Sequence, residues 1–301
     1  MQSENQYVHL PILVEKNITL AIKREDLLHP FISGNKYRKL KYNVLEAIHK
    51  KHTTLLTFGG AFSNHIAALS VAGKEKGLRT IGVIRGEELA QKWQTNPTLS
   101  LAHENGMRFK FVNRESYRTK TNPEFLDKLR QEFGQFYLVP EGGTNELAVK
   151  GCEEILDPID IEFDKICVST GTGGTITGLI NASEDTQEVL GFSALKGDFL
   201  KSDIASMTAK RNWKLICDYH FGGYAKISEE LVLFINWFKK ETGIPLDPVY
   251  TGKMVFGLLK MIENDSFAMG TKVLAVHTGG LQGLVGMNMV LKKKNLPLLD
   301  I

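Results

Sequence analysis

The chain has 301 residues, 43% of them hydrophobic and 24% charged, which is the ordinary composition of a globular protein with one large domain or two medium ones. Its formal net charge of +3 is small and its basic residues are spread along the chain, which argues against a nucleic-acid-binding protein. Three cysteines without a CxxC pair argue against a disulfide framework, and no apolar run approaches the roughly 20 residues of a membrane helix.

The first residues are not expected to form a signal peptide. Residues 1–17 lack the basic region followed by an apolar stretch that defines a signal peptide. Because the cysteines also suit a reducing compartment, we expect a cytoplasmic protein. The segments 7–14 and 18–26 then indicate two strands that flank a turn at Lys16-Asn17.

Residues 31–40, FISGNKYRKL, place Ser33-Gly34-Asn35 directly before Lys36. One interpretation is a helix cap followed by a solvated basic turn. The other is that Lys36 is a reactive amine held at the start of a helix. The segment alone does not decide between them.

The following helix is expected over 35–50, where Leu40, Val44, Leu45 and Ile48 form an apolar stripe at helical spacing. From residue 53 onward, short apolar or β-branched runs alternate with longer helical patterns. Strands that alternate with helices predict βαβ units and parallel sheets. The eight predicted strands are 53–58, 79–84, 108–112, 136–140, 164–169, 187–192, 213–218 and 272–277.

Eight strands after the N-terminal pair fit two sheets better than one. We therefore predict an α/β protein of two domains, each an open, twisted, mostly parallel sheet flanked by helices. The large domain would combine 1–38 with 147–301, and 39–146 would form a smaller inserted domain. The sequence marks these boundaries only weakly, because no Pro/Gly-rich linker separates them.

Residues 58–69, FGGAFSNHIAAL, run from a predicted strand through two glycines into an Ala-rich helix. Ser63 or Asn64 could serve only as the helix cap. A cap needs one such residue, however, and this turn offers Ser63, Asn64 and His65 together. The free amides of the turn could hold a substrate carboxylate, whereas His65 by itself more often has a structural role.

The strongest local signal is 169–179, STGTGGTITGL, between the predicted strand 164–169 and a helical pattern. Glycines let the backbone amides turn inward, and a helix start favours an anion such as phosphate. The spacing fits neither a P-loop nor a dinucleotide fingerprint, so the phosphate of a compact cofactor suits it better. The other interpretation of this segment is a tight turn between strand and helix with incidental glycines. The residues of this turn are Gly171, Thr172, Gly173, Gly174 and Thr175.

A helix is expected over 228–243, with a Ser cap and a terminal glycine. Two later segments, 247–254 and 277–284, also carry a turn that leads into a predicted helix. In the first, DPVYTGKM, Tyr250 at a helix start suits an acid–base phenol or a core residue. The third glycine-rich turn is 277–284, HTGGLQGL, after the last predicted strand. Because ligands bind outside the carboxyl ends of parallel strands, the three turns could converge on one crevice.

These motifs together resemble the 1-aminocyclopropane-1-carboxylate deaminase / D-cysteine desulfhydrase family of pyridoxal-phosphate (PLP) enzymes, which have the tryptophan synthase β-like fold (fold type II). GNKYRKL, GGAFSNH, GTGGT, DPVYTGK and HTGG match in the family's order and cover most of the chain. The resemblance implies pyridoxal 5'-phosphate as the cofactor, a small amino acid as the substrate, and a homodimer.

The resemblance also implies a role for each matched residue. Lys36 corresponds to the lysine that forms an imine with the cofactor aldehyde, and Lys39, one helical turn later, to a ligand of the cofactor phosphate. Asn64 corresponds to the residue that bonds the phenolic oxygen. Ser63 and His65 correspond to the loop that holds the substrate carboxylate, and Ser63 also to a catalytic residue in the deaminases.

The remaining matches complete the implied site. Tyr250 corresponds to an active-site tyrosine, and Tyr224, in a looser match, to another. The phosphate cup corresponds to Gly171, Thr172, Gly173, Gly174 and Thr175.

Two departures from the family pattern bear on the substrate. Phe62 stands where the family often has Gln. Thr251 stands where the cyclopropane deaminases carry a Glu that faces the pyridine nitrogen. Because a hydroxyl keeps that nitrogen protonated less well than a carboxylate does, Thr251 and Thr278 suggest a weaker electron sink, as in the D-cysteine desulfhydrase branch.

We therefore expect α,β-elimination from D-cysteine to pyruvate, ammonia and sulfide, with Lys36 taking the α-proton and Tyr250 or Tyr224 acting at the β-carbon. The first alternative is deamination of 1-aminocyclopropane-1-carboxylate to 2-oxobutanoate and ammonia. A PLP-binding protein without turnover is an alternative from another class. A dinucleotide-dependent dehydrogenase and a metal hydrolase are disfavoured, because the sequence lacks an early GxGxxG and an HExxH motif.

Overall fold

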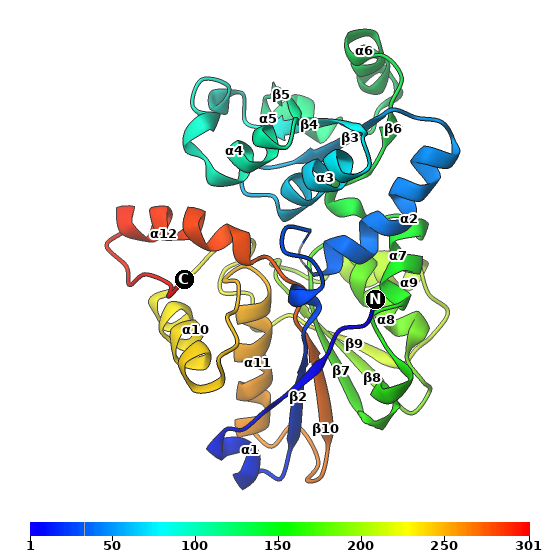
Figure 1. Cartoon of the computed structure of the whole chain (residues 1–301). Helices are drawn as coiled ribbons and strands as arrows, with labels where there is room; N and C mark the ends of the chain where they lie inside the picture. Colours follow the sequence, from blue (N-terminus) through cyan, green and yellow to red (C-terminus); the bar gives the residue numbers. More distant parts are fainter. Residues whose placement is uncertain (33) are drawn as a thin grey trace.

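The computed structural model describes residues 1–32 and 34–301, so the expected part of Ser33 in the loop before Lys36 lies outside the described residues. Two mostly parallel sheets, each covered by helices, form the molecule (Figure 1). The α/β prediction and its two sheets are therefore confirmed. All eight strands predicted after residue 53 are present, with ends that differ by a few residues.

The larger sheet has six strands in the order β1-β2-β10-β7-β8-β9. β1 pairs antiparallel with β2, and all other neighbours are parallel. The prediction of strands over 7–14 and 18–26 is partly wrong, because Pro11 begins a short helix, where its fixed φ is favourable. The strands are Asn5–Val8 (β1), Thr19–Lys23 (β2), Lys165–Thr170 (β7), Glu188–Ser193 (β8), Trp213–Ile216 (β9) and Lys272–Val276 (β10).

The smaller sheet has four parallel strands in the order β5-β4-β3-β6. Its last strand is shorter than the predicted 136–140, and Pro140, which cannot donate a ladder hydrogen bond, follows it. The strands are Thr54–Gly59 (β3), Arg79–Arg85 (β4), Arg108–Val112 (β5) and Tyr137–Leu138 (β6).

Helices cover both faces of each sheet. The α-helices are Pro11–Glu15 (α1), Asn35–His49 (α2), Asn64–Glu75 (α3), Pro97–Glu104 (α4), Arg114–Arg118 (α5), Pro123–Phe133 (α6), Glu146–Glu153 (α7), Gly174–Ala182 (α8), Leu200–Ser206 (α9), Glu229–Thr242 (α10), Thr251–Glu263 (α11) and Leu284–Lys293 (α12). Short 3₁₀ turns are Glu25–Leu27, Glu87–Leu89, Trp93–Thr95, Glu141–Gly143, Pro158–Glu162 and Leu281–Gly283.

The core follows the two-residue period of the strands. Leu20 and Ile22 pack with α10 and α11, whereas Ala21 between them packs with α7, α8 and α9 on the other face. Leu55 and the following Leu56 likewise enter different clusters on the two faces of the smaller sheet. Strands buried on both faces explain the nearly continuous apolar runs in the sequence.

Helix α2 forms as predicted, but its buried face differs in part from the predicted apolar stripe. Leu40, Val44 and Ala47 are buried in the core of the smaller sheet, at the spacing of one helix face. Leu45 and Ile48, which we expected on that face, are 53% and 44% exposed. α2 contacts both α3 and α7, so the division into 1–38 plus 147–301 and 39–146 remains a proposal.

Candidate active site

The candidate site is a cavity beyond the carboxyl ends of β3, β7 and β10, where the helices α2, α3, α8 and α11 begin. Free backbone amides and the positive ends of helices that follow strands of both sheets therefore point toward this cavity. Its lining residues are Asn35, Lys36, Lys39, Ser63, Asn64, His65, Gly142, Ser169, Thr170, Gly171, Thr172, Gly173, Thr175, Ile176, Tyr224, Tyr250, Thr278 and Gly279.

The lining includes every residue that the sequence analysis predicted for the site, except Gly174 and Thr251. Gly174 begins α8 next to the lining residue Gly173. Thr251 is fully buried behind Tyr250, at the start of α11. Residues that are distant in sequence, such as Lys36 and Tyr250, thus meet in one cavity.

The position of Lys36 depends on Gly34. Gly34 precedes α2 with φ +61°, and a Cβ atom built on it would lie 2.0 Å from the carbonyl oxygen of Thr278. The next residue, Asn35, donates its backbone N–H to that oxygen (3.3 Å) and its side-chain Nδ2–H to Thr175 Oγ1 (2.7 Å). Gly34 therefore permits the close approach that fixes the start of α2 against two other turns.

The Lys36 amine lies in this cavity and donates to Asn35 Oδ1 over 3.2 Å. Burial, assisted by the positive charge of Lys39, lowers the pKa of Lys36 to about 7. A large fraction of this amine is therefore unprotonated near neutral pH, as attack on an aldehyde requires. The site favours the reactive-amine interpretation of 31–40 over a solvated basic turn.

Lys39 is buried one helical turn further along α2. Its Nζ donates to Thr144 Oγ1 (2.9 Å), to the Gly142 carbonyl (3.2 Å) and to Thr172 Oγ1 (3.3 Å). Burial lowers its pKa. The ammonium thus stands beside the glycine-rich turn, where a phosphate dianion would supply the missing negative charge. The sequence analysis missed Thr144 and Gly142, which no motif marks.

The glycine-rich turn after β7 forms a cradle. Gly173 has φ +80° and precedes α8 without a side-chain cap, so the first amides of the helix remain available. A Cβ on Gly171 would lie 2.9 Å from the ring of Tyr250, and one on Gly174 would lie 3.3 Å from Lys39 Nζ. Amides, the hydroxyls of Thr172 and Thr175, and one ammonium are the donors that a phosphate requires, so the residues fit this group.

On the opposite side, Ser63 caps α3 by accepting the N–H of Ile66. Asn64 Oδ1 accepts a hydrogen bond from Gln282 Nε2 (2.7 Å). Because its oxygen is engaged, Asn64 keeps its amide N–H₂ group as a donor for a ligand. Gln282, a residue the sequence analysis missed, therefore orients Asn64.

His65 is buried, and its bonds define its tautomer. Thr57 donates its hydroxyl proton to the carbonyl of Val139 (2.8 Å), so it accepts from His65 Nε2–H (2.9 Å). His65 Nδ1 is then an acceptor, and among the described residues it has no hydrogen-bond partner. Burial, with the charges of Lys36 and Lys39, lowers the pKa of His65 well below its usual value, so the ring is neutral.

Two tyrosines line the cavity, and Tyr224 is 46% exposed at its edge. The rings of Tyr224 and Tyr250 meet edge to face with centroids 6.1 Å apart. Burial raises the pKa of both phenols, that of Tyr250 well above its usual value, with Tyr224 and Asp247 as further causes. Both are therefore protonated at neutral pH and can donate a hydrogen bond or a proton.

Asp247 explains the DPVYTG turn. Its carboxylate accepts the backbone N–H groups of Val249, Tyr250 and Thr251 and the hydroxyl of Thr251 over 2.8–3.0 Å. The Thr251 hydroxyl is thus engaged inside the turn and does not line the cavity. The sequence analysis missed Asp247, although an Asp before Pro is a turn signal that could have identified it.

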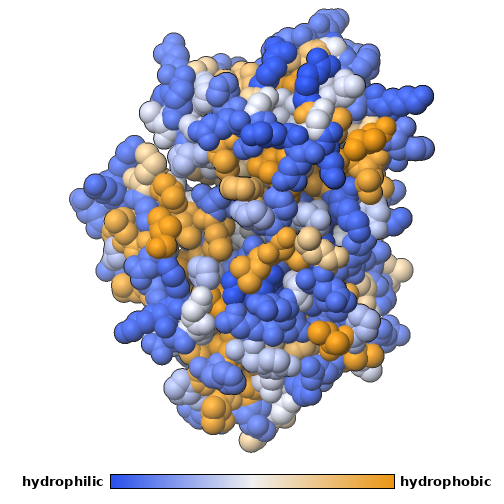
Figure 2. Space-filling view, viewed as in Figure 1, coloured by the Kyte–Doolittle hydropathy of each residue, from blue (hydrophilic) through white to orange (hydrophobic). Residues whose placement is uncertain are grey.

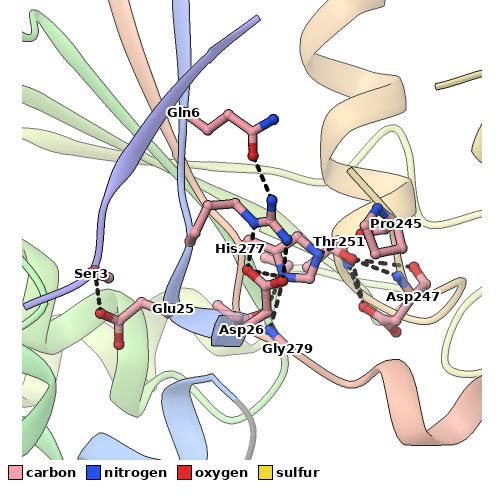
Figure 3. A network of polar contacts seen from close by, with 12 residues as sticks. Ser3, Gln6, Glu25, Asp26, Pro245, Asp247, Thr251, His277 and Gly279 are labelled. Atoms are coloured by element: carbon pink, nitrogen blue, oxygen red, sulfur yellow. Dashed lines mark hydrogen bonds and ion pairs between the residues drawn. The ribbon is translucent and has the colours of Figure 1, made fainter. Parts of the chain in front are cut away.

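A buried polar network supports the third turn from behind (Figure 3). His277 Nε2–H donates to the Pro245 carbonyl (2.7 Å), and Gly279 N–H donates to His277 Nδ1 (3.2 Å). Asp26, paired with Arg24 over 2.7 Å, lies 3.5 Å from the same nitrogen. The network fixes the turn that carries Thr278, whose hydroxyl meets that of Ser169 at 3.1 Å.

The described residues form neither a candidate metal site nor a membrane-spanning helix. Within residues 1–32 and 34–301, no group of three or more His, Cys, Asp or Glu side chains is arranged to hold a metal ion. The described helices include none with the length and apolar character needed to cross a membrane.

The fold and the cavity define an enzyme that holds a phosphate-bearing aldehyde cofactor against a partly buried lysine. Comparison with protein families agrees: the sequence profile described as "Pyridoxal-phosphate dependent enzyme" matches residues 2–279. The chain belongs to this family, and its cofactor is pyridoxal phosphate. The predicted family resemblance and cofactor are confirmed.

Similar proteins narrow the class. The chain is 32% identical over 292 residues to the bifunctional D-cysteine desulfhydrase/1-aminocyclopropane-1-carboxylate deaminase of Arabidopsis thaliana, covering 88% of this chain and 73% of that protein. It is 30% identical to the D-cysteine desulfhydrase of Klebsiella pneumoniae, covering 88% of each. The solved structure of an ACC deaminase homologue superposes with a TM-score of 0.84, at 29% identity over 97% of this chain and 94% of that one.

Proposed function

We propose that the protein eliminates sulfide from D-cysteine to give pyruvate and ammonia. One observation carries the proposal: Lys36, with its pKa lowered to about 7, lies in the same cavity as the phosphate cradle and two protonated tyrosines. The names of the Arabidopsis and Klebsiella relatives both include D-cysteine desulfhydrase, which supports this substrate.

The residues present would divide the work of holding the cofactor. Lys39 and the cradle Gly171–Thr175 would hold the phosphate, Asn64 the phenolic oxygen, and Lys36 the aldehyde carbon. When bound, the cofactor supplies electron delocalisation for a broken bond at the substrate α-carbon. The protein contributes orientation and the movement of protons.

The amino acid would lie between Lys36 and the turn after β3. Ser63 and the free amides at the start of α3 would hold its carboxylate. Neutral Lys36 Nζ would take the proton from the α-carbon. As the C–S bond breaks, the sulfur would leave with its electron pair and take a proton from Tyr250 or Tyr224. Water then converts the released enamine to pyruvate and ammonia. The proton that Lys36 took up returns to the tyrosine, so atoms and charges balance over one turnover.

The threonines support elimination over ring opening. Of Thr251 and Thr278, which the sequence analysis placed near the pyridine nitrogen, only Thr278 lines the cavity. A hydroxyl there would keep the ring nitrogen protonated less well than a carboxylate would. The resulting weaker electron sink suffices when the leaving group is a good one, such as sulfide.

Deamination of 1-aminocyclopropane-1-carboxylate to 2-oxobutanoate and ammonia is the second candidate. It is favoured by the double name of the Arabidopsis relative and by Ser63, which lines the cavity. A PLP-binding protein without turnover is less well supported, since such a protein need not retain Lys36, Asn64 and Tyr250 around one cavity.

A substrate panel tests the proposal. The cofactor-loaded protein is incubated with D-cysteine, L-cysteine, D-serine and 1-aminocyclopropane-1-carboxylate, and keto acid and sulfide are measured. We expect equal amounts of pyruvate and sulfide from D-cysteine, abolished by Lys36→Ala. Formation of 2-oxobutanoate alone would establish the second candidate, and no keto acid from any of the four substrates would refute both proposed activities.

We also propose a homodimer in the cytoplasm. Apolar side chains gather on the surface around α12 (Figure 2), where Val285 and Met289 are 49% and 44% exposed. Covering such side chains with a second copy would remove apolar area from water. Light scattering of the purified protein tests the dimer, which a monomeric mass at micromolar concentration would contradict.

A further inference from the structure

The loop that carries Tyr224 has an unusual backbone. We name residues 217–227, which join β9 to α10, the Tyr224 loop. Phe221 and Ala225 have φ of +53° and +54°, a region that side chains other than glycine rarely adopt. Gly222 and Gly223 have φ of +89° and +113°. Such strained conformations persist only where surrounding structure enforces them.

Helix α11 supplies that support through Lys253. The Lys253 side chain is buried, and its Nζ donates to the carbonyls of Gly223 (2.8 Å) and His220 (2.9 Å). These carbonyls belong to the strained stretch directly before Tyr224. Within the loop, Gly222 N–H donates to His220 Nδ1 (2.8 Å). Each carbonyl also accepts one backbone N–H inside the loop, His220 from Gly223 (3.0 Å) and Gly223 from Lys226 (3.1 Å). The Lys253 ammonium therefore joins two successive turns of the loop to α11 through their second acceptor positions.

Two apolar contacts extend the support along α11. The ring of Phe221 meets that of Phe256 edge to face at 4.9 Å. Tyr219 lies so close to Gly257 that a Cβ there would meet its ring at 2.6 Å. The loop is thus fixed to one face of α11, at positions 253, 256 and 257.

The same helix begins at the second tyrosine, because Tyr250 is its N-cap residue. α11 therefore determines the positions of both phenols: that of Tyr250 directly, and that of Tyr224 through the hydrogen bonds of Lys253. We infer that Lys253 is a positioning residue, which holds the Tyr224 loop so that Tyr224 faces Tyr250 at the entrance to the lysine cavity. The inference rests on the proposed function only where it concerns turnover.

The chemistry of Lys253 agrees with this role. Burial lowers its pKa to about 8, with Asp247 acting in the opposite direction. At neutral pH the side chain is mostly an ammonium, so it can donate to both carbonyls at once. Methionine has a similar length and no donor, and it would leave the two carbonyl oxygens without this partner.

Amide hydrogen exchange tests whether Lys253 holds the loop. In Lys253→Met, the amides of the Tyr224 loop should exchange about tenfold faster than in the wild type, while the strands of the six-stranded sheet keep their protection. Lys260→Met is the matched control, because Lys260 lies on the same helix and pairs with Glu263 at the surface. Unchanged loop exchange in Lys253→Met would overturn the inference.

A double-mutant cycle tests whether Lys253 acts through Tyr224. Lys253→Met and Tyr224→Phe should each lower kcat, by roughly tenfold, and the double variant should be little slower than either. Cofactor affinity should stay near that of the wild type. Additive losses, or a loss of thermal stability with unchanged kcat, would assign Lys253 a merely structural role.

The two arms separate this inference from the proposed function. If the wild type converts no amino acid to a keto acid, the proposed function fails, and the exchange result still decides whether Lys253 holds the loop. If D-cysteine is consumed while the loop is indifferent to Lys253→Met, only the present inference fails.

Discussion

At the scale of single residues, the most informative side chain is Lys36. Burial away from water and a second ammonium, Lys39, both disfavour a positive charge on its amine. An unfolded chain exposes both amines to water and returns them to ordinary lysine pKa values. Folding therefore sacrifices some stability to keep an unprotonated amine in the cavity.

The difference between the pKa of Lys36 in the folded and the unfolded chain predicts that the stability of the cofactor-free protein depends on pH. Because the pKa of Lys36 is about 7 when folded and about 10.5 when unfolded, the unfolded state binds more protons between these values. The free energy of unfolding should therefore rise with pH, by roughly 3 kcal/mol between pH 7 and 9.5 from this residue. Urea unfolding at both pH values measures it.

Lys36→Met removes the titrating amine and serves as the comparison. The variant should be more stable than the wild type at pH 7, and the difference should shrink at pH 9.5. A variant that is destabilised equally at both pH values would show that the Lys36 amine is not held in a depressed state.

At the scale of elements, the site depends on how helices begin. α2, α3, α8 and α11 all start at the cavity, and each start is fixed by a different device. α2 uses a glycine that approaches another turn, α3 a serine cap, α8 a glycine-rich turn, and α11 the carboxylate of Asp247. Changing one device should disturb one wall of the cavity.

Gly34→Ala makes this testable. The new Cβ would lie 2.0 Å from the Thr278 carbonyl at a backbone φ of +61°, so the start of α2 must shift. We expect a loss of stability of about 2 kcal/mol or more, and cofactor affinity lowered at least about tenfold. Urea unfolding and cofactor titration measure the two effects.

Gly77→Ala is the matched control. Gly77 has nearly the same φ, +66°, but a Cβ atom on it would meet no other part of the described chain within 4 Å, apart from its own sequence neighbours. The Gly77→Ala variant should lose only the roughly 1 kcal/mol of stability that a positive φ costs a residue with a Cβ atom, and it should keep its cofactor affinity. Equal effects of the two substitutions would contradict the role assigned to the Gly34–Thr278 contact.

The elements also show what could be predicted from the sequence. Strands, helices and glycine-rich turns were predictable because their signals are local. Lys253 and Gln282 were missed because their partners, His220 and Asn64, lie far away in sequence. The helix at Pro11 was missed because apolar residues in a short segment suit either a strand or a helix.

At the scale of the whole molecule, the cofactor would bridge two sheets. Asn64 follows a strand of the smaller sheet, Gly171 and Thr278 follow strands of the larger one, and Lys36 lies on the helix that contacts both parts. A ligand held by all of these groups binds the folded protein and not the unfolded chain. It must therefore stabilise the fold by mass action.

Removal of pyridoxal phosphate should accordingly lower the midpoint of thermal unfolding. With cofactor at about 100 times its Kd, the stabilisation is about 2.7 kcal/mol, which corresponds to a shift of roughly 4 °C for a chain of this size. Differential scanning fluorimetry with and without cofactor measures the shift, and Lys36→Ala should show a smaller one. Identical midpoints for the loaded and cofactor-free wild type would exclude this bridging role.

The antiparallel β1 at the edge of the larger sheet has a distant effect of its own. Gln6, on that strand, accepts from Arg24, which grips Asp26 behind the His277 turn. Deleting the residues up to the end of β1 would thus remove support from the turn that carries Thr278, although none of the deleted residues lines the cavity. An affinity tag fused at the amino terminus should therefore leave the pairing of β1 with β2 intact.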